Sequence, residues 1–108
     1  MTPLQILTRA RKLLSNRKRW CQGASARDKR GLPTLPLSDN AVSFCAYGAI
    51  QRASDGDIGQ CDIILDKEAC RISKKKGNIA SYNDARGRTH AQILALFDSA
   101  IARLKAKK

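Results

Sequence analysis

The two ends of this chain carry the same helix-start signature, which constrains the fold more than any other feature of the sequence. Near the N-terminus, "TPLQ" places Thr2 as an N-cap, Pro3 at the first helical position and Gln5 as the second half of a capping box. Near the C-terminus, "THAQ" repeats this pairing with Thr89 and Gln92. Because apolar residues recur at helical spacing after both starts, the pattern predicts one amphipathic helix at each end of the chain.

Two further helices are predicted between these ends. Ser38 followed by Asp39 is typical of a helix start, and "DNAVSFCAYGAIQRA" then places apolar residues on one helical face, which predicts a central helix. A third helix is predicted over residues 58–72, ended by the run Lys74 to Gly77. The segment "NIASYND" fits either a short helix or an extended segment.

The 108 residues are enough for one compact domain and too few for two. With only two Phe, two Tyr and one Trp, the core is expected to consist mainly of Leu, Ile and Ala, which favours packed helices. The sequence therefore predicts an all-α fold: residues 1–108 form a small single-domain helical bundle of about four helices, with a long loop after the first helix.

That loop, over residues 20–37, has the Gly, Pro and charged composition of an irregular segment. It is long for a structureless connection in a small domain, and loops of this length are often functional or held by packing. We predict that Trp20 and the three leucines Leu32, Leu35 and Leu37 pin it to the core.

Charge is unevenly distributed along the chain. Residues 1–30 and 71–108 each carry a net charge of +8, whereas residues 31–70 carry −4, for a total of +12. Such ends attract polyanions, whether nucleic acid, an anionic membrane or an acidic protein. The arginine-rich first helix also resembles a mitochondrial presequence or a membrane-surface helix, although a solvated basic face over a Leu stripe is the simpler interpretation. No apolar run could span a membrane and no secretory signal precedes the first helix, so we expect the cytoplasm.

The four cysteines follow no metal-ligand spacing. The sequence has no C-x-x-C pair and a single histidine, His90, so no metal site and no cofactor is predicted. Cys45 and Cys61 are expected to be small core residues inside helices. A P-loop, a dinucleotide fingerprint, a serine elbow and a calcium loop are also absent from the sequence.

The stretch "NDARGRTHAQ" has two interpretations. Arg86 and Arg88 precede the helix start at Thr89, where free N–H groups and the helix dipole favour an anion. Alternatively Gly87 makes a tight turn, Thr89 uses an N–H group for its own cap, and Asp84 neutralises either arginine. Caps of this kind are commoner than ligand sites, so the structural turn is the favoured interpretation.

A catalytic interpretation would use Cys21 as a nucleophile, with its pKa lowered by the basic residues 17–19. His90 would act as base, and Asn83 or Asp84 would orient it. No family signature of cysteine hydrolases surrounds Cys21, so this is the least favoured interpretation and we predict a non-enzymatic protein.

Nucleic acid is the first polyanion to consider. Basic residues on the first helix, in the C-terminal tail and at Lys74, Lys75 and Lys76 could neutralise several phosphates, giving salt-sensitive binding with little sequence preference. No helix-turn-helix spacing is evident, and aromatic residues are too few for a stacking platform. An acidic protein partner is the alternative.

Four segments, "RWCQG", "AVSFCAYGAI", "SYND" and "GRTHAQILALFDSAI", carry a resemblance that spans nearly the whole chain. The chain resembles a family of small uncharacterised bacterial and phage proteins. These share a Trp-Cys-x-Gly turn, a central helix with x-Gly-Ala, a Trp-Asn-Asp segment and an Arg-Thr-x-x-x-Val-x-x-Leu-Phe-Asp-x-Ala-Ile ending. Phe44 and Tyr82 stand where such sequences more often have Trp, so an aromatic residue is retained.

The resemblance implies a shared fold and brings no activity with it. It implies a polar cluster of Asn83, Asp84, Arg88 and Thr89 beside Trp20 and Cys21, which we predict to be the surface that binds a ligand. The leading functional hypothesis is engagement of a polyanion, with nucleic acid or a nucleic-acid-bound complex first. The second is a phage or mobile-element accessory protein that binds and inhibits a host protein.

Overall fold

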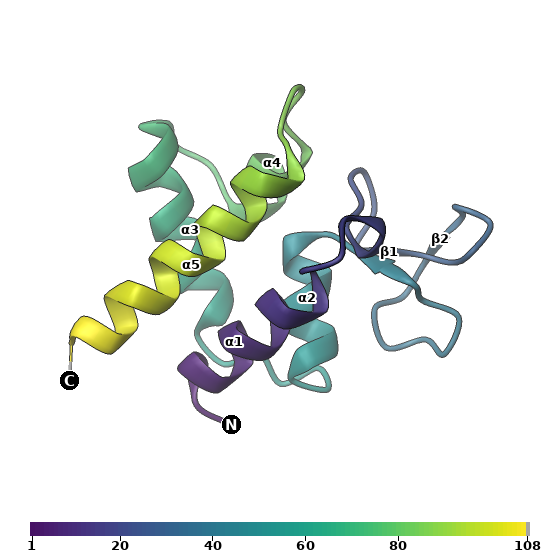
Figure 1. The fold of residues 1–108 in the computed structure, drawn as a ribbon, viewed down its shortest axis with the longest axis horizontal. Coiled ribbons are helices and arrows are strands. Elements are labelled where there is room, and N and C mark those ends of the chain that lie inside the picture. Colours follow the sequence, from purple (N-terminus) through teal and green to yellow (C-terminus); the bar gives the residue numbers. More distant parts are fainter. Residues whose placement is uncertain (108) are drawn as a thin grey trace.

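Five α-helices and one small sheet make up residues 1–107, the part of the chain that the computed structural model describes (Figure 1). Lys108, the last residue of the predicted domain, lies outside it. In Figure 1 the helices gather on one side and the long loop after α1, with its strands, forms a lobe on the other. In chain order the elements are α1 (Pro3–Leu13), the 3-10 turn η1 (Arg17–Arg19), β1 (Ala26–Arg27), β2 (Pro33–Thr34), β3 (Ser43–Phe44), α2 (Ala46–Ala53), α3 (Cys61–Ser73), α4 (Ile79–Asp84) and α5 (His90–Ala106).

The prediction of an all-α fold is wrong. Three two-residue strands form an antiparallel sheet in the order β2-β1-β3, in which Ala26 lies opposite both Thr34 and Phe44. The fold is therefore α+β, and the described residues contain five α-helices where about four were predicted. Strands this short have no hydrophobic alternation to reveal them, so the sequence carried no usable signal.

The predicted start of the central helix at Ser38 is also wrong. The backbone of Cys45 is still extended, with φ −76° and ψ 175°, and its Sγ accepts a hydrogen bond from the Gly48 N–H at 3.3 Å. The carbonyl oxygens of Pro36 and Ser38 instead accept hydrogen bonds from the Arg52 guanidinium at 2.9 and 2.8 Å. Tertiary contacts thus hold the predicted first turns as loop and strand, and the helix begins at Ala46.

The terminal helices begin where the capping boxes predicted. Thr2 and Gln5 exchange both capping hydrogen bonds at the start of α1, and Thr89 and Gln92 do so at the start of α5. The third helix starts later than predicted, at Cys61, and ends before Lys74, whose backbone is left-handed with φ 59°. The ambiguous segment "NIASYND" forms α4.

A core of aliphatic and small residues joins all five helices and the sheet, as the composition predicted. Two phenylalanines, Phe44 and Phe97, add the largest buried side chains. The aliphatic and small residues that make up the rest of the core include Ile6, Leu7, Ala10, Leu14, Ala26, Ala46, Ala49, Ile50, Leu65, Ile79, Ile93, Leu96 and Ala100.

No helix within residues 1–107 combines the length and the apolar character that a membrane span requires.

The long loop is held by its backbone and not by its leucines. Leu32, Leu35 and Leu37 are 49%, 74% and 48% exposed, so the prediction that they pin the loop is wrong. Trp20 does pack against the core. The loop backbone lies against the start of α2: the Ser25 carbonyl accepts a hydrogen bond from the Cys45 N–H at 3.1 Å.

Candidate functional site

The buried side chain of Asn83 joins the loop to the helices. Its Oδ1 accepts hydrogen bonds from the Trp20 indole Nε1–H at 2.8 Å and from the Ala46 backbone N–H at 3.0 Å. Its Nδ2 donates to the Cys21 carbonyl at 3.1 Å and to the Asp84 carboxylate at 2.9 Å. These four bonds saturate the amide, so Asn83 can be fully buried at low cost.

The carboxylate of Asp84 and the side chain of Gln22 complete this arrangement, which we call the Asn83 junction. Asp84 Oδ1 accepts from the Gly23 N–H at 3.0 Å. Gln22 Nε2 donates to the Asn83 carbonyl at 2.9 Å. The carboxylate of Asp84 therefore binds the backbone of the long loop. The predicted ion pair of Asp84 with Arg86 or Arg88 is not formed within residues 1–107. Sequence reasoning missed Gln22, because a neutral polar residue in a loop gives no periodic signal.

Cys21 and His90 make separate contacts. The Cys21 thiol donates to the Ala24 carbonyl at 3.6 Å, and His90 Nε2 contacts the Leu14 carbonyl at 2.6 Å. Burial raises the pKa of the Cys21 thiol, and Ser43 and the nearby Arg27 offset that rise only in part. An activated nucleophile requires the opposite shift, so this geometry does not favour a Cys21–His90 pair.

The stretch before α5 contains a well-satisfied turn. The Arg88 guanidinium lies 3.7 Å from the centroid of the Tyr82 ring, and its Nε donates to the Tyr82 carbonyl at 2.8 Å. Gly87 has φ 82°, a left-handed conformation that suits glycine. Arg86 is exposed beside it. The favoured interpretation of this stretch as a turn is consistent with these contacts, and Arg88 still faces a hollow on each side.

Three surface hollows are lined by basic residues and by no acidic residue, whereas a fourth hollow with basic residues also contains Glu68. The first, the α3–α4 hollow, has a volume of about 240 Å³ and is lined by Lys75, Lys76 and Arg88 together with Cys70 and Tyr82. Lys74 is exposed but lies outside this lining. The structure therefore brings two of the three predicted lysines together with one of the predicted arginines.

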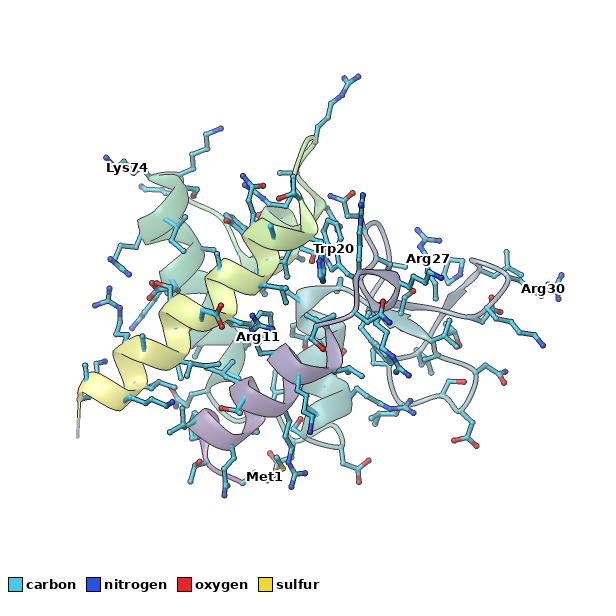
Figure 2. The ribbon with its side chains drawn as sticks, in the orientation of Figure 1. Met1, Arg11, Trp20, Arg27, Arg30 and Lys74 are labelled. Atoms are coloured by element: carbon cyan, nitrogen blue, oxygen red, sulfur yellow. The ribbon has the colours of Figure 1, made fainter. Side chains whose placement is uncertain are left out.

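The second hollow, the Trp20 hollow, has a volume of about 410 Å³. Arg88 lines it as well as the first hollow, and Arg17 of η1 is its second basic residue. The remaining lining comes from the side chains and backbone of Trp20, Thr89, His90 and Ala91. Figure 2 places Trp20 between the end of α1 and the loop lobe, near the start of α5.

The third hollow, the α1 hollow, has a volume of about 350 Å³ and continues this surface along the first helix. Its basic lining residues are Arg9, Lys12 and Arg19. The Trp20 hollow shares Arg88 with the α3–α4 hollow and shares the η1 turn, which contains Arg17 and Arg19, with the α1 hollow. We call the three together the basic hollows.

None of the basic residues of the basic hollows forms an ion pair within residues 1–107. Seven basic residues line these hollows, and no acidic residue is among the described residues that line them. The ion pairs within residues 1–107 use other arginines: Arg11 pairs with Asp98 at 2.9 Å, and Glu68 pairs with Arg71 and Arg103. The positive potential of the hollows is therefore available to a ligand.

Glu68 shows how acid and base meet elsewhere in the fold. Its side chain is 3% exposed between α3 and α5, where it accepts hydrogen bonds from Ser99, Arg71 and Arg103. Burial alone would raise the pKa of Glu68, but these three donors together lower it.

Among the described residues, no group of three or more His, Cys, Asp or Glu side chains could hold a metal ion.

Comparison with known protein families confirms that the chain belongs to an uncharacterised family, while the shared motifs and the bacterial or phage origin stay predictions. A model of a family of unknown function, DUF6197, matches residues 1–103. The chain belongs to this family. No curated protein and no solved structure matches it.

Within this DUF6197 chain, the segments behind the resemblance meet in space. Trp20 and Cys21 from the first segment and Asn83 and Asp84 from the third form the Asn83 junction. Four of the six residues of the predicted cluster therefore meet, and their polar atoms are largely occupied by one another. The binding role of the cluster remains a prediction, and Trp20 joins the junction to the basic hollows because it bonds Asn83 and lines the Trp20 hollow.

Proposed function

We propose that this protein is a non-enzymatic binding module that engages a polyanion, with nucleic acid as the first candidate. The observation that carries the proposal is that three hollows, linked by Arg88 and by the η1 turn, are lined by seven Lys and Arg residues and by no acidic residue. Hollows lined by one sign of charge focus the electrostatic potential and raise the local concentration of a ligand of opposite charge.

The net charge of +12 adds a long-range attraction to this surface. Each phosphate that a lysine or arginine neutralises releases condensed counterions, so affinity falls steeply as salt rises. Engagement of all seven residues would give a log–log salt slope of up to about −6 on duplex DNA. Most of these contacts are made to phosphates, so little sequence preference is expected.

The test is a fluorescence-polarisation titration with labelled DNA and RNA at several salt concentrations from about 50 to 200 mM. The test variant is Lys75→Ala/Lys76→Ala, and the matched control is Lys29→Ala/Arg30→Ala. The control removes the same charge from the loop lobe, where Arg30 lies at the opposite end of the molecule from Lys74, the neighbour of the mutated lysines (Figure 2).

We expect the test variant to lose about tenfold in affinity, and its slope of log affinity against log salt concentration to become shallower by about two units. The control should change this slope little. Equal losses in the two variants would mean that only the total charge matters and that the hollows are not the binding surface. Absence of binding by the wild-type protein at low salt would overturn the proposal.

A second candidate is a cytoplasmic accessory protein of a phage or mobile element that binds and inhibits a host protein. It is favoured by the exposed leucines Leu32, Leu35 and Leu37, which cluster in the sequence of the loop lobe and do not serve the core. Such a partner would remain bound in moderate salt, and Leu35→Asp would release it. A partner whose binding is insensitive to Leu35→Asp would exclude this surface.

A further inference from the structure

One hollow differs from the other two in combining basic residues with two aromatic rings. Trp20 and His90 both line the Trp20 hollow between Arg17 and Arg88. Among the described aromatic residues, Phe44 and Phe97 are fully buried, and the Tyr82 ring is covered by Arg88. Tyr47 lines a hollow of its own, but Asp62 and Asp66 line it too, which disfavours a phosphate there.

Both aromatic rings of the Trp20 hollow are held in place by polar contacts with other parts of the protein. The Trp20 indole is fixed by its hydrogen bond to Asn83, and the His90 ring is fixed by its contact with the Leu14 carbonyl. Their centroids are 6.2 Å apart and their planes are inclined by 42°. Rings that are already oriented lose little conformational freedom when a planar ligand stacks on them.

The volume and position of the hollow also suit one base of a strand. Its volume of about 410 Å³ lies in the range of small-ligand sites, about 300 to 1,000 Å³. It is the middle one of the basic hollows, since it adjoins both of the others through Arg88 and η1. A strand with a base in this hollow would place its neighbouring phosphates toward basic residues on either side.

We infer that the Trp20 hollow accepts one unpaired nucleobase, with Arg17 and Arg88 on the flanking phosphates, and so gives the basic surface a preference for single-stranded over double-stranded nucleic acid. The inference rests on the proposed function and adds the class of ligand to it. In a duplex every base is stacked and paired, and extracting one opposes binding. A stack on an aromatic ring strengthens binding by about fivefold or more without sequence preference.

The single tryptophan of the chain makes the inference directly measurable, because its fluorescence comes from the hollow itself. The probes are a single-stranded DNA of about 12 nucleotides, the duplex of the same sequence and inorganic polyphosphate. Each is titrated into the wild-type protein, with polarisation of a labelled competitor reporting how much has bound. The expected result is quenching by single-stranded DNA at saturation, little change with polyphosphate at equal occupancy, and about fivefold or greater preference for the single strand.

A pair of variants gives the matched control. Arg17→Ala and Arg9→Ala each remove one exposed arginine from the basic hollows, but only Arg17 lines the Trp20 hollow. Arg17→Ala is expected to reduce the preference for single-stranded DNA, whereas Arg9→Ala should weaken the binding of both DNA forms equally.

Three outcomes would overturn the inference. If all probes bind with equal affinity and leave the tryptophan fluorescence unchanged, the proposed polyanion function stands and the base site does not exist. If polyphosphate quenches as strongly as single-stranded DNA, the signal reports charge and not stacking, which also removes the base site. If no probe binds at low salt, both the proposed function and this inference are wrong.

Discussion

The Asn83 junction and the basic hollows are neighbouring regions that differ in whether their polar side chains have partners within the protein. At the junction, the donors and acceptors of Asn83 are satisfied by Trp20, Cys21, Ala46 and Asp84 within the protein. In the basic hollows, the described cationic side chains have no acidic partner. The difference indicates that the junction builds the fold and that the hollows are available for binding.

Burial is the physical reason for this difference. A buried amide must find partners inside the protein, because leaving a donor or acceptor unpaired costs about 1–3 kcal/mol. An exposed lysine or arginine is hydrated and needs no internal partner. Substitutions at the junction should therefore change stability, and substitutions in the hollows should change binding.

The largest effect is expected at Gly48, which allows the loop backbone to lie against α2 beside the junction. A Cβ added there would lie 1.8 Å from the Ser25 carbonyl oxygen, so Gly48→Ala must move the two backbones apart. We expect a loss of about 3 kcal/mol or more in the free energy of unfolding, measured by urea denaturation. Gly87→Ala is the control: its site is open but has φ 82°, so a loss of about 1 kcal/mol is expected. Equal losses in the two variants would contradict the close approach.

Removal of the Asn83 side chain should have the next largest effect. Asn83→Ala leaves the Trp20 indole and the Ala46 N–H without their partner, which should cost about 2–3 kcal/mol of unfolding free energy. Urea denaturation measures the loss, and polyphosphate affinity of the folded fraction should stay within about twofold of wild type. A large loss of affinity in a still-folded variant would mean that the junction itself contacts the ligand.

The sequence predicted local structure better than tertiary contacts. Both capping boxes lie within four residues, so their chemistry could be read directly, and α1 and α5 begin where predicted. The start of α2 depends on Arg52 reaching Pro36 and Ser38 and on strand pairing across the loop, and no local pattern encodes those contacts. This is why the helix predicted from Ser38 and the all-α fold were both wrong.

The sequence predicted the residues of the candidate site but not how they are arranged in space. The basic segments were evident from composition, and the structure joins Lys75, Lys76 and Arg88 in one hollow. Asn83 and Asp84 were predicted to bind a ligand because they are polar and lie in a matching segment. Only three-dimensional contacts reveal that Trp20 and Gly23 already occupy their polar atoms.

A smaller, pH-dependent effect is expected where acid and base do pair, at Glu68. Because its pKa is lowered in the folded state, its stabilising contribution is present above the unfolded value of about 4.3 and is lost as pH falls through the folded pKa. Glu68→Gln should cost about 1–2 kcal/mol at pH 7, since the partly exposed Arg71 and Arg103 can be hydrated in its absence. Urea denaturation at pH 7 and at about pH 3, below the unfolded pKa, should show a smaller loss of unfolding free energy for the variant than for wild type. An unchanged decline would mean that other carboxylates carry the acid sensitivity.

The smallest effect is expected at Arg88, which contacts Tyr82, the neighbour of Asn83 in the sequence, and lines the basic hollows. Its guanidinium bonds the Tyr82 carbonyl and covers the Tyr82 ring, yet it also lines two of the basic hollows. Arg88→Lys keeps the charge and loses the planar contact, so it should cost about 1 kcal/mol of unfolding free energy with little loss of polyphosphate affinity. Arg88→Gln should lose similar stability and also about threefold in affinity, measured by competition polarisation at low salt. If the lysine variant binds as weakly as the glutamine variant, the ligand needs the guanidinium geometry, and the charge of Arg88 is not sufficient to explain its part in binding.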